Sequence, residues 1–256
     1  MINNKVYVTD NTGFDISSAT LHILAMGLML MDHLWATLLP GQEWMTCVGR
    51  IAYPIFAFMA VEGYFHTHSF KKYALRLLLF AVLSEIPFDL MYGGMMFYPF
   101  HQNVIWTLLL GLTGIHLMEK VKDRQKTWVY VVAAVVVTAV WTLLGTICMV
   151  DYYGAGILTI FTFYFFRGRK WWCFLGQLAA LYWINVEMLG GLMYPIEVFG
   201  MEFELCQQGL ALLALLPIWL YRGRLGYHSK TFQRICYGFY PAHMLILALL
   251  LMYVNR

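Results

Sequence analysis

Long apolar runs, separated by short polar or glycine-containing segments, follow one another along almost the whole chain. Runs of this length predict helices that cross a lipid bilayer, because one crossing of a core about 30 Å thick takes roughly 20 residues. We expect spans at 19–39, 48–66, 72–92, 103–118, 127–146, 150–166, 171–188, 205–221 and 236–254. The pattern therefore predicts an all-α fold, a polytopic transmembrane helix bundle of about nine spans, with eight or ten as alternatives.

The segment before the first run is polar and contains Asp10 and Asp15. It lacks the basic start and the cleavage site of a secretory signal. We expect residues 1–18 to form an N-terminal tail and residues 19–256 to form a single transmembrane domain.

Lysine and arginine residues are concentrated in alternate connections between the expected spans, at 67–72, 119–126, 167–170 and 222–235. Of the 17 basic residues, only Arg50 and Arg256 fall on the other side of this arrangement. Because cytoplasmic loops carry an excess of positive charge, the distribution predicts a cell-membrane protein with a cytoplasmic N-terminus.

Composition agrees with this prediction, since 61% of the residues are hydrophobic and the mean hydropathy is +0.65. The net charge of +3 is distributed over the loops and does not form one basic stripe, so we expect lipid and not nucleic acid as a partner. The five cysteines show no metal-ligand spacing, and we expect no metal site.

Charged and other polar side chains nevertheless occur inside the apolar runs. Each charge costs about 2.5–3.5 kcal/mol at a helix centre, so several together are expected to face one another or a water-filled cavity. In the expected arrangement they gather in the outer half of the bundle, where Arg50 is available to neutralise Glu85 or Asp89. A polar clamp between helices is the alternative to a reactive site. The members of this outer group are Asp32, His33, Arg50, Glu85, Asp89, His101, Asn103 and Asp151.

A second, smaller group lies nearer the cytoplasmic side. Glu62 and His66 are four residues apart on one helix face, and Lys72 and Arg76 follow. These residues suit a mouth that attracts the phosphates of an anionic cofactor, although basic residues at such a boundary also extend to lipid headgroups. His243 lies inside the last span behind Pro241, where a single histidine is more often a packing residue than a catalyst.

Several specific motifs resemble the TraX family of integral membrane acyltransferases, whose namesake N-acetylates pilin. The motifs are "MGLMLMDHLWATL", "GRIAYPIFAFMAVEGYFHT", "KKYALRLLLFAVLSEIPFDL", "HQNVIWTLLLG" and "YGFYPAHMLIL"; residues 120–235 match weakly apart from "DYYGAG" at 151–156. The family looks related to multi-span acetyl-CoA-dependent acyltransferases. The positions that the resemblance marks are Asp32, His33, Gly49, Arg50, Pro54, Glu62, Gly63, Arg76, Ser84, Glu85, Pro87, Phe88, Asp89, Gln102 and Asn103.

The resemblance implies a transfer of an acetyl group from cytoplasmic acetyl-CoA to an amine or hydroxyl acceptor at the outer side, with a peptide N-terminus among the candidates. His33 is the expected general base, and Arg50 either stabilises the oxyanion or balances a carboxylate. Adjacent residues of a helix point about 100° apart, so Glu85 or Asp89, and not Asp32, is expected to orient His33. The catalytic set is Asp32, His33, Arg50, Glu85 and Asp89; the acceptor or support set is Ser84, His101, Gln102, Asn103 and Asp151; the cofactor set is Glu62, His66, Lys72, Arg76 and His243.

The pantetheine arm of acetyl-CoA, about 15–20 Å long, reaches halfway across a core about 30 Å thick. The acceptor is expected to meet the short loop 93–102 or the acidic segment 187–204. A proton-coupled transporter is the competing function, since buried Asp, Glu and His chains are also typical of transporters. The polar residues crowd into the first four spans and show no inverted repeat, which favours the enzyme; a non-catalytic scaffold would need fewer buried charges. Binding of acetyl-CoA distinguishes these classes.

Overall fold

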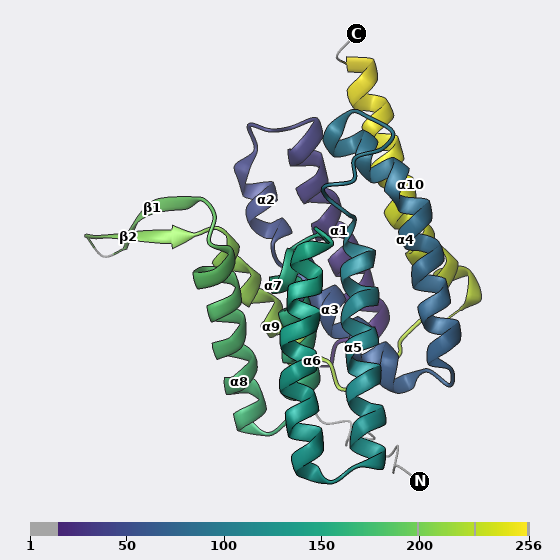
Figure 1. The fold of residues 1–256 in the computed structure, drawn as a ribbon. Helices are drawn as coiled ribbons and strands as arrows, with labels where there is room; N and C mark the ends of the chain where they lie inside the picture. The colour runs from purple at the N-terminus through teal and green to yellow at the C-terminus, as the bar shows by residue number, and fades with distance from the viewer. Residues whose placement is uncertain (1–14, 199, 228, 255–256) are drawn as a thin grey trace.

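The computed structural model describes residues 15–198, 200–227 and 229–254, and it is a bundle of helices with one β-hairpin (Figure 1). Residues 1–14 of the expected tail, and Arg256, lie outside the described residues. The division into a tail and a single domain stays a prediction.

The elements follow one another in a simple order. They are α1 (Ser18–Thr37), α2 (Glu43–Gly49), α3 (Ala52–His66), α4 (Phe70–Gly93), α5 (Val104–Arg124), α6 (Thr127–Ile147), α7 (Tyr153–Phe165), α8 (Trp171–Tyr182), a π-helix (Trp183–Leu189), β1 (Met193–Val198), β2 (Met201–Cys206), a 3₁₀-helix (Gln208–Ala214), α9 (Leu215–Leu220) and α10 (Lys230–Val254). The all-α prediction is confirmed, apart from the hairpin.

Among the described residues, five helical segments are long and apolar enough to cross a membrane: Ser18–Thr37, Glu43–His66, Val104–Arg124, Thr127–Ile147 and Lys230–Val254. The second of these joins α2 and α3, which are separated only by a turn at Arg50 and Ile51. α4 has 24 residues but is not among the five, and it carries five charged side chains. The structure thus supports a membrane protein and does not confirm the count of nine spans.

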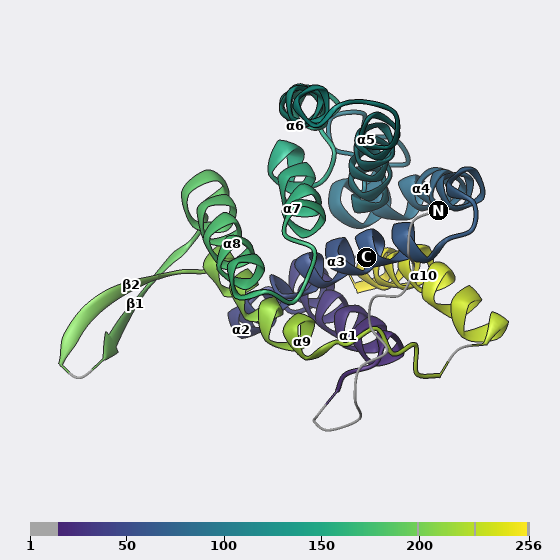
Figure 2. The same ribbon diagram turned by 90° about the horizontal axis from the view of Figure 1, so that it is seen from below.

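The last third of the chain differs most from the expected spans. The segment expected to span at 205–221 consists of the end of β2, the 3₁₀-helix and the six-residue α9, and the helix expected at 171–188 ends in a π-helix. β1 and β2 pair antiparallel, and the hairpin projects away from the helices (Figures 1 and 2). The helical part of the expected span 205–221 is therefore only Gln208–Leu220, too short to be among the five segments, and the structure does not confirm this span.

Polar residues mark where several helices begin. The Ser17 hydroxyl accepts a hydrogen bond from the Thr20 backbone at the start of α1, and the Ser69 hydroxyl caps α4. Asn103 caps α5, where its Oδ1 accepts from the backbone N–H of Ile105 at 3.1 Å. Such caps satisfy backbone donors that have no partner inside the helix. Asn103, which the sequence assigns to the outer polar group, therefore also has a structural function.

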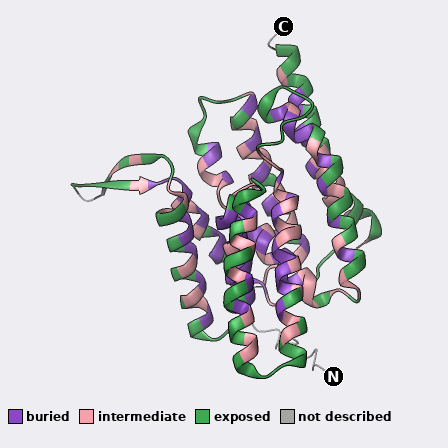
Figure 3. Ribbon diagram, in the orientation of Figure 1, coloured by how far each residue is buried: buried purple, intermediate pink, exposed green. Residues whose placement is uncertain are grey.

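α3 lies at the centre of the bundle, with α1, α5 and α7 packed against it (Figure 2). Its Ile55, Ala57 and Val61 are completely buried. α6 instead exposes Val131, Val132, Val135, Val136 and Val140 on its outward face, as Figure 3 shows for this helix. A bilayer would cover such an apolar face.

The connections lie at two opposite ends of the bundle. The loops from α3 to α4, α5 to α6 and α7 to α8 lie at the lower end in Figure 1. Lysine and arginine residues lie in these loops or in the adjoining helix turns, and we call this the basic end. The loops from α1 to α2, from α4 to α5 and from α6 to α7 lie toward the upper end, which we call the opposite end. In the α6–α7 loop, Met149, Tyr152 and Tyr153 have φ values of 52°, 60° and 48°, in the left-handed region.

Candidate functional site

A cavity of about 120 Å³ opens in the half of the bundle toward the opposite end. Its walls come from α1, the end of α2, α3, α4 and α10, from the first residue of α5 and from the residues just before α7. We call it the outer cavity. The lining side chains that carry charge, a hydroxyl or an imidazole are Asp32, His33, Arg50, Tyr53, Tyr92, Asp151, Tyr152 and Tyr240.

Arg50 and Asp32 form an ion pair in the wall of this cavity. Arg50 occupies the turn between α2 and α3, and its guanidinium also donates to the backbone oxygen and the hydroxyl of Thr46, at 3.3 and 3.2 Å. A Cβ atom at Gly49 would lie 2.5 Å from that of Asp32, so a glycine there permits the close approach of α1. The expectation that Arg50 neutralises Glu85 or Asp89 is wrong, because α1, and not α4, supplies its carboxylate.

His33 is buried, and it contacts a second histidine from the far end of the chain. Its Nδ1 lies 2.7 Å from Nε2 of His243, and the two rings are nearly parallel, at 10°, with centroids 4.9 Å apart. A short nitrogen–nitrogen contact at that separation is typical of two rings that meet edge to edge in one plane. Neither Glu85 nor Asp89 contacts His33, so that expectation is also wrong; His243, which we assigned to the cofactor set, takes this position.

The hydrogen bonds of the two histidines determine their tautomers in the neutral state. His243 Nδ1 lies 2.6 Å from the backbone oxygen of Phe239, and a carbonyl oxygen only accepts, so Nδ1 of His243 carries a proton. Its Nε2 then has a lone pair and accepts from Nδ1–H of His33. The remaining nitrogen, Nε2 of His33, therefore has the free lone pair that a general base needs.

Four tyrosines that were not among the expected site residues line the same cavity. Tyr53 and Tyr152 stack with centroids 4.3 Å apart, and the Tyr53 hydroxyl donates to the Gly156 backbone oxygen at 2.8 Å. Tyr92 and Tyr240 present ring edges to His33, at 6.0 and 6.5 Å. The "DYYGAG" motif at 151–156 was a signal for Tyr152, whereas no local pattern indicated that the other three face one cavity.

The carboxylates of α4 lie outside the outer cavity and join α4 to α5 and its preceding loop. Glu85 accepts from the Asn103 amide and, at 3.0 Å, from the Trp106 indole. Asp89 is buried and accepts from the Tyr98 backbone at 2.8 Å. Ser84 is fully buried beside them, without a hydrogen-bond partner for its hydroxyl among the described residues. This geometry is that of the interhelical clamp, the alternative considered for these residues.

The α4–α5 loop and the α6–α7 loop contact each other beside the outer cavity through His101, Gln102 and Asp151. His101 Nε2 lies 3.4 Å from Asp151 Oδ1, and this carboxylate raises the pKa of the His101 side chain, partly offset by burial. The Gln102 backbone donates to Met149 and accepts from Asp151, both at 2.9 Å. Of the acceptor or support set, Asp151 alone lines the outer cavity.

The expected cofactor residues divide between two places at the basic end. Glu62 is buried and accepts two bonds from Arg167, at 2.7 and 3.1 Å, while His66 Nδ1 lies 3.8 Å from Glu62 as their spacing predicted. Lys72 and Arg76 are exposed on α4, and neither lines a described cavity. The structure therefore brings Glu62 and His66 together and separates them from Lys72 and Arg76.

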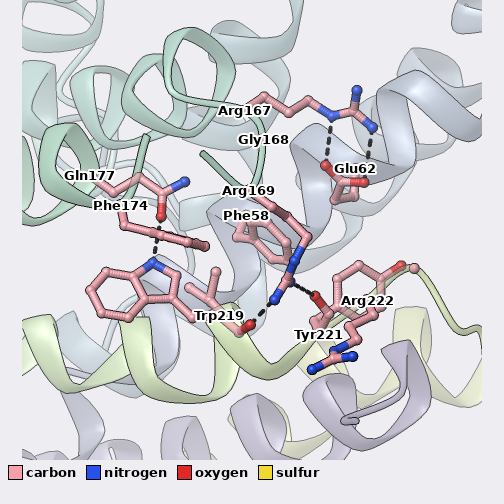
Figure 4. Close-up of a pocket in the computed structure, with 12 residues that line it drawn as sticks. Phe58, Glu62, Arg167, Gly168, Arg169, Phe174, Gln177, Trp219, Tyr221 and Arg222 are labelled. Atoms are coloured by element: carbon pink, nitrogen blue, oxygen red, sulfur yellow. Dashed lines mark hydrogen bonds and ion pairs between the residues drawn. The ribbon is translucent and has the colours of Figure 1, made fainter. Parts of the chain in front are cut away.

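A second, smaller cavity of about 40 Å³ lies beside Glu62 (Figure 4). Arg167, Arg169 and Arg222 line it, and we call it the arginine pocket. From the sequence these residues were expected only to be positive flanks of spans. The repeated tripeptide Arg-Gly-Arg, at 167–169 and 222–224, is the sequence signal for this pocket. Within the described residues, no three His, Cys, Asp or Glu side chains are grouped as potential metal ligands.

Apolar helices around a buried cavity with paired charges and histidines define a multi-pass membrane protein with an internal polar site. The pattern of the TraX protein family matches residues 17–251, and the chain belongs to this family.

The chain is also similar to the probable fimbrial assembly protein FimC, serogroup H1, of Dichelobacter nodosus, with 32% identity over 112 residues. This similarity covers 40% of the chain and 46% of that protein, so the match spans less than half of the relative. No solved structure matches the chain.

Proposed function

We propose that the protein is a membrane-embedded acyltransferase that moves an acetyl group from cytoplasmic acetyl-CoA to an amine, or a hydroxyl, presented at the other side of the membrane. The observation that carries the proposal is a chain of two hydrogen bonds at the outer cavity. It links the Phe239 carbonyl to His243, and His243 to His33. Membership of the TraX family supports it.

The proposed chemistry uses His33 as the general base. The acceptor nitrogen attacks the thioester carbonyl, a carbon–nitrogen bond forms, and Nε2 of His33 takes the proton that the nitrogen loses. His243 accepts a hydrogen bond from Nδ1–H and so stabilises the imidazolium that forms. When the carbon–sulfur bond breaks, His33 returns the proton to the thiolate of CoA, which leaves as the thiol.

Arg50 is the proposed partner of the oxyanion that develops on the thioester oxygen. Its contacts with Asp32 and Thr46 hold the guanidinium in the cavity wall before substrate arrives. Donors that are fixed in advance stabilise developing charge without reorganising during the reaction. The hydroxyl groups of Tyr92 and Tyr152 line the same wall and are further candidate donors.

The arrangement along α3 suits a donor that enters from one end and an acceptor that enters from the other. Phe58 and Glu62 line the arginine pocket, whereas Tyr53 and Phe56 line the outer cavity. Tyr53 and Glu62 are separated by about 13 Å of helix rise. An extended pantetheine arm of about 15–20 Å covers that distance.

The similarity to a fimbrial assembly protein favours a peptide amine of a pilus subunit as the acceptor. The loop 93–102 and the hairpin that contains Glu197, Glu202 and Glu204 lie toward the opposite end, as a site that receives a cationic amine requires (Figure 1). Acidic groups there would attract the amine before it loses its proton.

The proposal is tested with purified protein in lipid nanodiscs, acetyl-CoA and a synthetic peptide with a free N-terminus. Mass spectrometry should detect the acetylated peptide, and a peptide that is already blocked at its N-terminus should stay unchanged. His33→Gln should abolish transfer, whereas His68→Gln, a change in an exposed loop, should not. Transport of protons without binding of CoA would instead support the competing transporter function.

A further inference from the structure

Two Arg-Gly-Arg segments, far apart in sequence, meet at the arginine pocket. The first, 167–169, connects α7 to α8, and the second, 222–224, follows α9. Gly168 and Gly223 have φ values of 148° and 91°, which side chains with a Cβ atom rarely adopt. The glycines thus allow both segments to turn sharply at the cavity, with arginines on either side.

The pocket is strongly positive, because three arginines and a single carboxylate, Glu62, line it. Arg167 is paired with Glu62, and Arg169 donates to the backbone oxygens of Trp219 and Tyr221, at 3.1 and 2.9 Å (Figure 4). These contacts use part of the donor capacity and fix the two side chains in place. Two positive charges remain in excess of the single carboxylate in a partly enclosed space, where fields are focused.

Arg222 has a different environment. Its Nε is buried and has no hydrogen-bond partner among the described residues, although its backbone N–H donates to Asp15 at 3.1 Å. A buried donor of a charged group that lacks an acceptor is costly, and native proteins rarely leave one. An anionic ligand in the pocket would supply the acceptor that this side chain lacks.

Two other polar side chains of the wall, Trp219 and Gln177, already have hydrogen-bond partners. The Trp219 indole donates to Gln177 at 2.8 Å, and the Gln177 amide donates to Phe166 at 3.0 Å. The enclosed space of about 40 Å³ suits one small anionic group. Guanidinium groups bind phosphate through paired charge-assisted hydrogen bonds, and the charge of a phosphate monoester, about −1.5 to −2 at pH 7, matches the two positive charges in excess.

We propose that the arginine pocket binds a phosphoryl group, and that the group belongs to the nucleotide head of the acyl donor. The assignment of the donor rests on the proposed function; the phosphoryl chemistry rests on the pocket alone. Bound there, the head is at the basic end, and α3 leads from it to the outer cavity. A phospholipid headgroup is the other source of the same chemistry.

The test is a binding measurement on the intact protein in nanodiscs of neutral lipid. The probes are CoA, adenosine 3′,5′-bisphosphate and short-chain phosphatidylglycerol, applied to wild type, Arg222→Gln, Arg222→Lys and Arg124→Gln. Arg124 is exposed at the same end and lines no described cavity, which makes it the matched control. Arg222→Gln should weaken the binding of CoA and of the bisphosphate about tenfold or more, since a charge-assisted contact is lost. Arg222→Lys should be intermediate, and Arg124→Gln should bind as wild type does.

Thermal stability separates a ligand-binding arginine from a structural one. If Arg222 only holds the fold together, Arg222→Gln should melt at a lower temperature without ligand. If it awaits a ligand, the unliganded variant should melt at the same or a higher temperature, and the stabilisation by CoA should disappear.

The outcomes also separate this inference from the proposed function. Loss of CoA affinity in Arg222→Gln supports both the phosphoryl site and its source, even if no peptide becomes acetylated. Loss of phosphatidylglycerol binding with unchanged CoA affinity keeps the phosphoryl site and overturns the nucleotide as its source. Unchanged affinity for all three probes overturns the inference, while acetyl transfer by the same variant would leave the proposed function intact.

Discussion

At the ion pair of Arg50 and Asp32, a structural role and the proposed catalytic role predict different effects of substitution. Their side chains are 19% and 13% exposed, so each charge depends on the other for compensation. Arg50→Gln or Asp32→Asn alone should therefore lower the free energy of unfolding, by up to about 3–5 kcal/mol for a buried pair. The double variant should recover most of that loss, yet transfer should stay about 10²–10³-fold slow if Arg50 stabilises the oxyanion.

Thermal unfolding and single-turnover transfer measure the two quantities on the same samples. Arg124→Gln is the control, because Arg124 is exposed at the end of α5 and lines neither cavity. Recovery of both stability and transfer in the double variant would show that the pair is a clamp and not part of the reaction.

His243 is a positioning residue in the proposed mechanism, and two substitutions distinguish this from simple packing. His243→Leu removes the acceptor for Nδ1–H of His33, and turnover should fall about 10²–10⁴-fold, as for loss of the orienting group of a triad. His243→Gln offers an amide oxygen to the same proton and should retain more activity than the leucine variant. The readout is kcat at saturating acetyl-CoA. Equal activity of the two variants would reduce His243 to a packing residue.

At the scale of single residues, the sequence indicated which residues belong to the candidate site but not which of them are in contact. The "MDH" motif and the resemblance pointed to His33, and the cost of buried charge pointed to Arg50. The partner of His33 is 210 residues away, on a helix that no local pattern places beside α1. Contacts between distant helices depend on the packing of the whole bundle, which periodicity does not determine.

The loops before α5 and α7 form one unit at the level of elements, and His101 and Asp151 make that unit sensitive to pH. Asp151 raises the pKa of His101, so the protonated imidazole is favoured in the folded state. The resulting stabilisation is complete below the ordinary pKa of about 6.5 and is lost as the pH rises through the higher folded value.

Because the pair is partly exposed, at 32% and 28%, the contribution should be below about 1 kcal/mol. The melting temperature of wild type should exceed that of His101→Gln at pH 5.5, and the difference should vanish at pH 9. A difference that grows toward pH 9 would contradict the pairing.

The hydropathy pattern did not predict the hairpin of β1 and β2. In Met201–Cys206, Glu202 and Glu204 alternate with Met201, Phe203 and Leu205, a period of two that is typical of a strand. The apolar run that follows is long enough to suggest a membrane helix, and this length determined the predicted span at 205–221. The helix there begins only at Leu215 and ends at Leu220, because the chain first passes through the strand and a 3₁₀-helix.

The whole molecule has two chemically different ends, and this polarity can be measured in cells. The positive-inside rule predicts that the basic end is cytoplasmic. A cysteine introduced as Arg124→Cys should react with a membrane-impermeant maleimide only after permeabilisation, whereas the native Cys148, exposed in the α6–α7 loop, should react in intact cells. Labelling with the reverse accessibility would invert the topology and, with it, the proposed sides of donor and acceptor.

Hydrophobic length alone predicted the class of the fold and most of the long helices. α1, α5, α6 and α10 match their predicted spans within a few residues at one or both ends. The hydropathy pattern did not predict the break between α2 and α3, because Arg50 is a single charge inside a continuous apolar run. That break is what turns Arg50 toward Asp32, so the site depends on a feature that the hydropathy of the chain does not record.

The residues with positive φ in the α6–α7 loop are candidates for substitutions that would make the protein more stable for structure determination. Such a conformation costs a residue with a Cβ atom about 1–2 kcal/mol, which glycine does not lose. Met149 is exposed and lies outside both cavities, so Met149→Gly should raise the melting temperature in detergent without changing acetyl transfer. Tyr152 carries the same strain but stacks on Tyr53 inside the outer cavity, and relief of its strain would remove that ring. Within this loop, Met149 is therefore open to substitution, whereas Tyr152 belongs to the proposed site.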